Sequence, residues 1–176
     1  MKSAGAAIVA LSAVLDRIGL FLAKAALVGM VGVIMLQVVS RYGLRQPPTW
    51  TEELARYLMV WGGLLGAASA FRRATDPVVV KVDELAGDRR ARFARLAIAA
   101  TVVIFIGPIL YFSIFGAGMD PARGFLVRMS ARSSPALGIN MVFIASAIPT
   151  VCTLLLVHLA ARLVAGPLPV SHGETR

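Results

Sequence analysis

The chain has 176 residues, of which 58% are hydrophobic and 15% charged, and its formal net charge is +9. A soluble domain of this size could not cover so much apolar surface with so few polar groups, so composition excludes an ordinary water-soluble protein. The basic residues stand at the ends of apolar stretches, where phospholipid headgroups are the nearest anionic partner. We therefore expect contacts with membrane lipids and no nucleic-acid partner.

Four long apolar stretches predict four transmembrane helices, at about residues 18–40, 54–71, 96–115 and 137–163. A helix rises about 1.5 Å per residue, so about 20 apolar residues cross a hydrocarbon core about 30 Å thick. The prediction is an all-α integral membrane protein in which residues 1–176 form a single four-helix membrane domain. Short interfacial helices are expected in its connections.

The N-terminal run Ala4–Leu15, which follows Lys2, faintly resembles a signal peptide. It is short, it stops at Asp16–Arg17, and a full span follows, so we expect no cleavage. We interpret this run as a helical lead-in that lies on or enters the membrane.

Two features inside the first two spans are notable. Lys24 stands about a turn and a half from Arg17, close enough for its ammonium group to snorkel to the headgroups. In the second span, Gly62, Gly66 and Ala70 repeat every four residues and form a stripe on which another helix can pack closely. Such a stripe identifies no partner.

The densest polar segment connects the first two spans and runs from residue 41 to residue 57. Thr49 and Glu52 have the spacing of a capping box, which would start a helix just after two prolines. Glu52 and Glu53 are both within reach of Arg56, four and three residues later. The pattern therefore predicts a capped helix entry that neutralises its own charge.

A functional interpretation makes Glu52 or Glu53 a proton or cation site, because ionisable groups near a membrane core are costly and often functional. The structural interpretation is favoured, since both residues lie at the edge of the span, with Trp50 and Tyr57 as interface anchors. Adjacent helix residues also point about 100° apart, so the two carboxylates cannot easily grip one ion. We expect at least one of them to face a protein neighbour.

The connection between the second and third spans predicts helices of its own. Asp76–Pro77 is a favoured helix start and Gly87 a favoured end, which describes a short helix in the plane of the interface. Asp88 can cap a second helix that leads into the third span. Lipid anchoring is the favoured role of the basic residues here, and the lipid-interface candidates are Arg72, Arg73, Arg89, Arg90, Arg92 and Arg95.

Charge asymmetry predicts the orientation. With four spans, both termini and the middle connection share one side of the membrane, and that side carries eleven basic residues against six on the other. Positively charged short loops are retained in the cytoplasm, so we expect both termini and the middle connection on the cytoplasmic side.

Motifs for chemistry are missing from the sequence. Cys152 is the single cysteine, and the two histidines stand in the fourth span and the tail, at His158 and His172. No Ser/His pair, phosphate-binding glycine loop or metal-ligand cluster is present, so we expect no enzyme, no catalytic residue, no metal and no cofactor. A transporter that worked alone would need an ionisable residue deep in a span, and we predict none.

Several segments together resemble the small membrane subunit of tripartite ATP-independent periplasmic (TRAP) transporters, the DctQ-like proteins. The resemblance covers most of residues 30–155. Its most specific block begins at Val39-Ser40-Arg41-Tyr42 and continues through Trp50-Thr51-Glu52-Glu53-Leu54-Ala55-Arg56. It extends to Phe71-Arg72-Arg73, to Val82-Asp83-Glu84-Leu85, and to Ser134-Pro135-Ala136-Leu137-Gly138-Ile139. One departure is that Val79 occupies a place where family members often have a histidine.

The resemblance implies a non-enzymatic subunit of a sodium-driven importer of an organic acid, such as a dicarboxylate, sialic acid or another sugar acid, in the bacterial inner membrane. It implies two partners, a large multi-span subunit that this chain braces and a periplasmic binding protein that it helps to dock. The candidates for subunit interface or docking are Arg41, Tyr42, Trp50, Glu52, Glu53, Arg56, Gly62 and Gly66. The alternative is a self-sufficient small exporter or channel formed by homo-oligomers of this chain.

Overall fold

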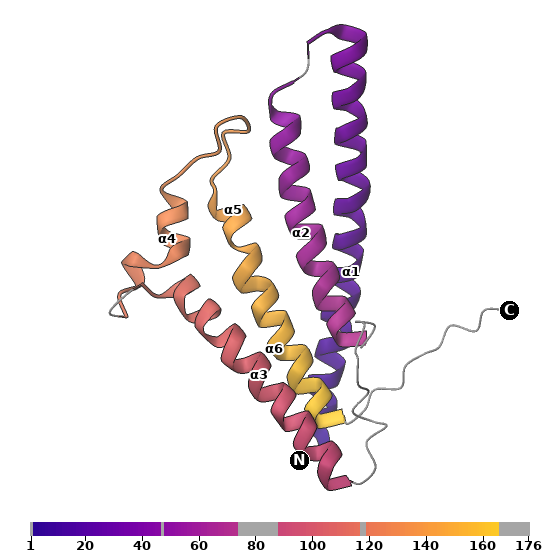
Figure 1. The fold of residues 1–176 in the computed structure, drawn as a ribbon, viewed down its shortest axis with the longest axis vertical. Coiled ribbons are helices and arrows are strands. Elements are labelled where there is room, and N and C mark those ends of the chain that lie inside the picture. The colour runs from indigo at the N-terminus through magenta and orange to yellow at the C-terminus, as the bar shows by residue number, and fades with distance from the viewer. Residues whose placement is uncertain (1, 47, 74–87, 117–118, 166–176) are drawn as a thin grey trace, which may run out of the picture.

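The computed structural model describes residues 2–46, 48–73, 88–116 and 119–165. Its long elements are α1 (Lys2–Val39), α2 (Trp50–Arg73), α3 (Asp88–Ile114) and α6 (Ala147–Ala165). Figure 1 shows α1 and α2 side by side as an antiparallel pair, with α6 beside their lower half and α3 diverging from them. Within the described part of the chain, four helices are long and apolar enough to cross a membrane. The all-α membrane fold predicted from the sequence is confirmed.

The first helix is much longer than the predicted span at residues 18–40. The lead-in Ala4–Leu15 and the span form one unbroken helix, which continues into a π-helical turn, η1 (Ser40–Leu44), and ends at Arg45 with a left-handed φ of 56°. The lead-in packs against protein, because a Cβ placed on Gly5 would lie 2.7 Å from Val164 Cγ1 of α6. Alanine and leucine favour helix throughout this segment, so Asp16 does not interrupt it.

Small residues allow α1 and α2 to approach closely. A Cβ placed on Gly62 would lie 3.4 Å from Ala26 Cβ and 3.5 Å from the carbonyl oxygen of Ala23. The other predicted glycine of this stripe, Gly66, faces open space. The buried core lies where α1, α2 and α6 meet, and it consists of Ala23, Leu65, Ala68 and Val151.

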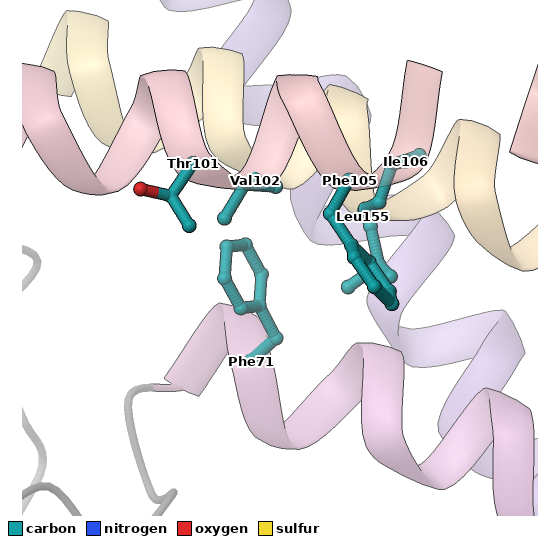
Figure 2. Close-up of a pocket in the computed structure, with 6 residues that line it drawn as sticks. All are labelled: Phe71, Thr101, Val102, Phe105, Ile106 and Leu155. Carbon is teal, nitrogen blue, oxygen red and sulfur yellow. The ribbon is translucent and has the colours of Figure 1, made fainter. Parts of the chain in front are cut away.

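The third helix is described from Asp88 onward and runs without a break into the membrane-spanning segment. An apolar groove of about 290 Å³ lies between this helix, α6 and the end of α2. Figure 2 shows the residues that line it, which are Phe71, Thr101, Val102, Phe105, Ile106 and Leu155. The Thr101 hydroxyl is already bonded to the carbonyl oxygen of Ala97, at 3.0 Å. The groove therefore presents an apolar lining. The predicted interfacial helix from Asp76 to Gly87 lies outside the described residues.

The fourth span begins later than residue 137. After η3 (Pro121–Arg123) and α4 (Phe125–Ser130), the chain forms a turn in which Ser133 and Asn140 pair as an isolated bridge. Helix resumes only at α5 (Val142–Ala145), just before α6. Gly138 has a φ of 68°, a left-handed conformation that ends helical propagation, so the last helix does not begin near residue 137, where the predicted span starts.

Candidate functional site

The described residues contain two polar clusters, one at each end of the α1–α2 pair. The Glu53 cluster comprises Glu53, Tyr57, Ser134, Ala136 and Leu137. Glu53 Oε2 accepts hydrogen bonds from the backbone amides of Ala136 at 3.0 Å and Leu137 at 3.2 Å. Its other oxygen accepts from the Tyr57 hydroxyl at 2.5 Å. One carboxylate thus ties the start of α2 to the turn before α5.

This geometry explains why the turn is not helical. The amides of Ala136 and Leu137 point at an anion instead of at carbonyl groups of a helix, and the Ser134 side chain accepts a third bond from the Leu137 amide, at 3.2 Å. Backbone amides that converge in a turn form a concave site for negative charge. Here the occupant is the chain's own Glu53.

The neighbouring charges have other partners than predicted. Glu52 accepts a hydrogen bond from Gln37 Nε2 of α1 at 3.2 Å, and its side chain is exposed. Among the described residues Arg56 forms no ion pair with either glutamate, and it too is exposed. The prediction of a self-neutralised helix entry was therefore wrong, because Glu53 accepts from two backbone amides and the Tyr57 hydroxyl instead of pairing with Arg56.

At the other end of the pair lies the Asp16 cluster, which comprises Ser12, Asp16, Ser69, Arg72, Arg73 and His158. The Asp16 side chain is only 3% exposed. It accepts a hydrogen bond from the Ser69 hydroxyl and forms ion pairs with Arg72 at 3.2 Å and Arg73 at 3.1 Å. Three groups of α2, one hydroxyl and two guanidinium groups, are thereby gathered around one buried carboxylate of α1.

The cluster extends to the fourth span through Ser12. The Ser12 hydroxyl accepts a bond from Arg72 Nε at 3.1 Å and lies 2.8 Å from His158 Nδ1 of α6. Ser12 and His158 are each 1% exposed. A hydroxyl has one proton and two acceptor sites, so Ser12 can accept from the arginine and donate to the ring nitrogen at once.

Arg162 adds a second link between α6 and α2. Its Nη1 donates to the carbonyl oxygen of Phe71 at 3.1 Å, and its guanidinium carbon lies 5.2 Å from the centre of the Phe71 ring. Phe71 is also the residue through which α2 contributes to the apolar groove (Figure 2). Arg162 therefore supplies a donor to a carbonyl group in the last turn of α2.

These contacts provide the buried polar side chains with hydrogen-bond partners. In the part of the chain that the structure describes, no buried side-chain nitrogen or oxygen lacks a hydrogen-bond partner. Nor do three His, Cys, Asp or Glu side chains of that part gather as a metal site. The two clusters hold helices together, and among the described residues no buried side-chain nitrogen or oxygen is left unpaired for a substrate.

The structure distributes the residues predicted as site candidates over different surroundings. Arg41, Tyr42, Glu52 and Arg56 are exposed, and Trp50 is 37% exposed, so these side chains are available to a partner. Glu53 and Gly62 are instead engaged within the chain. Arg72 and Arg73, predicted as lipid contacts, lie against Asp16, although Arg73 remains 46% exposed.

Sequence reasoning missed Ser12, Asp16, Ser69 and His158. Asp16 was interpreted as the end of an apolar run and His158 as a lone histidine. The available signal was the cost of burial, since an aspartate inside a helix of apolar residues needs a cationic partner. The arginine pair at residues 72–73 was the natural candidate.

Comparison with known proteins identifies the class to which this chain belongs. The family model for tripartite ATP-independent periplasmic transporters, DctQ component, matches residues 30–166. The matched segment includes both the Glu53 cluster and the α2 and α6 parts of the Asp16 cluster. The chain is a member of the DctQ family of TRAP transporter components.

A curated relative agrees with this class. Over 87 residues the chain is 26% identical to the sialic acid TRAP transporter permease protein SiaT of Haemophilus influenzae (strain 86-028NP). The match covers 49% of this chain and 14% of that protein. The chain thus corresponds to a small part of a much longer permease.

We predict that Asp16→Asn strongly destabilises the fold, because it leaves two arginines beside a buried site without a carboxylate. Removing one partner of a buried ion pair costs about 3–5 kcal/mol. The matched control is Asp120→Asn, which breaks the exposed 3.4 Å pair with Arg123 and should cost about 0–1 kcal/mol. Thermal unfolding in detergent measures both, and equal midpoints for the two variants would refute a stabilising role of the Asp16 cluster.

We predict that Glu53→Gln loosens the turn at residues 133–140. The amide group of glutamine directs a donor at one of the sites where the carboxylate accepts hydrogen bonds, so the turn or the Tyr57 contact must be lost. A single cysteine at Arg132, with Cys152 replaced by serine, should then react several-fold faster with a water-soluble maleimide. Glu52→Gln is the control and should leave the rate unchanged, and the same rate in all three proteins would contradict the prediction.

Proposed function

We propose that this chain is the small membrane subunit of a sodium-coupled TRAP transporter that imports an organic acid across the bacterial inner membrane. In this role it braces a large multi-span subunit and helps to dock a periplasmic substrate-binding protein. The family assignment supports the transporter class. The sialic acid named for the relative is one member of the acid class proposed here, and the specific acid is left open.

The observation that carries the proposal is that the interior of the described chain offers nothing to a substrate. Its buried polar atoms are paired with one another, and its groove between α2 and α3 is apolar. A carboxylate substrate requires unoccupied donors or cations in a pocket. The chain is therefore better suited to support a transport subunit than to bind the acid itself.

The orientation belongs to the same proposal. With the termini inside, the Asp16 cluster lies toward the cytoplasm and the Glu53 cluster toward the periplasm, where the binding protein would dock. The exposed arginines Arg41 and Arg56 and the exposed Tyr42 are then available on the periplasmic side.

We predict the following labelling pattern for that orientation. In a Cys152→Ser background, a cysteine at Arg45 should react with a membrane-impermeant maleimide in intact cells, and a cysteine at Arg90 should react only after the cells are opened. The reverse pattern would show that the orientation is wrong.

We predict that the tagged chain co-purifies from mild detergent with a larger multi-span membrane protein in a one-to-one ratio. Arg56→Ala should lower the amount retained several-fold if this exposed side chain is desolvated at the interface, whereas Arg128→Ala, in the loop helix α4, serves as control. In liposomes the purified chain alone should transport nothing. Uptake or efflux by homo-oligomers of the chain alone would support the alternative of a self-sufficient exporter or channel.

A further inference from the structure

Lys24 lies near the middle of the membrane-spanning part of the molecule. Its neighbours on α1, Ala23 and Ala26, contact Gly62 of α2. Gly62 is the thirteenth of the 24 residues of α2, so it stands roughly 17 Å from either end of that helix at 1.5 Å per residue. Level with the middle of α2, Lys24 stands deeper in the helix bundle than its spacing from Arg17 suggested, because α1 continues well beyond Arg17.

The Lys24 side chain points away from the rest of the chain. Its position on α1 is exposed, and it belongs to a seam spaced alternately by three and four residues, which we call the open face of α1. The apolar members of the open face are Phe21, Val28, Val31 and Met35, with exposures of 71%, 74%, 52% and 58%. A 3-4 spacing places side chains on one stripe of a helix, as in the seams of packed helix pairs.

The opposite stripe of α1 is the one used inside this chain. It carries Ser12, Asp16, Ala23 and Ala26, which are all buried against α2 or α6. Other positions of α1, among them Ile18 and Leu22, are exposed as well, so the helix has one filled seam and a broad uncovered surface. Within that surface, the open face is the stripe that carries a charge between apolar side chains.

Lipid does not satisfy that charge. Along α1, Lys24 stands about 12 Å beyond Asp16, and a lysine stem extends about 6 Å, so the ammonium group stops short of the headgroups. Among the described residues, no acidic side chain pairs with it. An exposed ammonium group at this depth is costly and calls for a compensating group from outside the chain.

We propose that the open face of α1 packs against a transmembrane helix of the large subunit, and that Lys24 forms an ion pair with a carboxylate of that helix. This inference rests on the proposed function, and it adds which face docks and which chemistry the partner supplies. A second copy of this chain is a poor occupant, because a symmetric contact through the same seam would bring two Lys24 ammonium groups together. A partner helix with an Asp or Glu at this depth would both neutralise Lys24 and pack against the apolar side chains of the open face.

The test uses the complex of the tagged chain with the large subunit in mild detergent. Lys24→Met keeps an unbranched side chain and removes the charge, and it should lower the retained large subunit about tenfold, which corresponds to about 1.4 kcal/mol of binding free energy. Lys24→Glu should lower it further, and Lys24→Arg should retain it. Membrane levels of each variant are measured alongside, so that loss of the chain is not counted as loss of binding.

A photo-crosslinking residue distinguishes the docking face. Placed at Val28 on the open face, it should crosslink to the large subunit, whereas at Ile104 on α3, which is 72% exposed, it should not. Full retention by Lys24→Met, or crosslinks from position 104 and none from 28, would overturn the inference while the complex itself stands. If the wild-type chain retains no large subunit, the proposed function fails first, and this inference with it.

Exchanging the charges of Lys24 and its proposed acidic partner is a further test, in which restored binding is the expected result. Lys24→Glu is combined in turn with Lys at each membrane-embedded Asp or Glu of the large subunit. One such combination should restore retention to within about twofold of the wild type, because it re-forms the pair with its charges reversed. Failure of every combination would contradict a direct ion pair.

Discussion

The arrangement of helices depends on the cost of placing a carboxylate in an apolar interior. Asp16 is almost fully buried, and an ionised carboxylate in such a place must be compensated by cations and hydrogen bonds. Arg72, Arg73 and Ser69 supply that compensation from one turn of α2. Because these contacts are geometrically demanding, α1 and α2 can pair in only one register. The Ser12–His158 contact then fixes α6 against the same turn.

The Glu53 cluster fixes how the segments at the other end of the bundle are oriented, which apolar packing alone cannot do. Apolar side chains are as well accommodated by lipid tails as by one another, so packing alone provides little direction between helices in a bilayer. Glu53 fixes the relative position of two segments, because its carboxylate accepts hydrogen bonds from two backbone amides that lie more than 80 residues away in the sequence. Trp61 contributes nearby, since its indole nitrogen donates to the carbonyl oxygen of Phe143 at 3.2 Å. Polar contacts thus hold the bundle together at both ends of the α1–α2 pair, and small residues allow close packing between them.

Hydropathy predicted the number and approximate position of the spans, because length and apolar composition alone decide whether a helix can cross a bilayer. The lead-in is helical, as predicted, but its continuity with the first span and its packing on α6 were not foreseen. The late start of the fourth helix was missed because residues 136–137 donate to Glu53 instead of to a helix. The family resemblance drew attention to the right block around Glu53 without revealing its partner. Asp16 and His158 were missed because their significance lies in a contact between segments that are distant in the sequence.

The length of α1 has a consequence for the lipid around the protein. Its 38 residues extend roughly 57 Å at 1.5 Å per residue, against a hydrocarbon core of about 30 Å. Because Asp16 and Arg17 interrupt the apolar sequence after the lead-in, an upright helix carries its apolar lead-in out past the headgroups, whereas a steeply tilted one draws it into the bilayer. Either arrangement costs more in a thinner membrane. The stability of this subunit is therefore coupled to the acyl-chain length of its lipids, and its first helix makes it sensitive to hydrophobic mismatch.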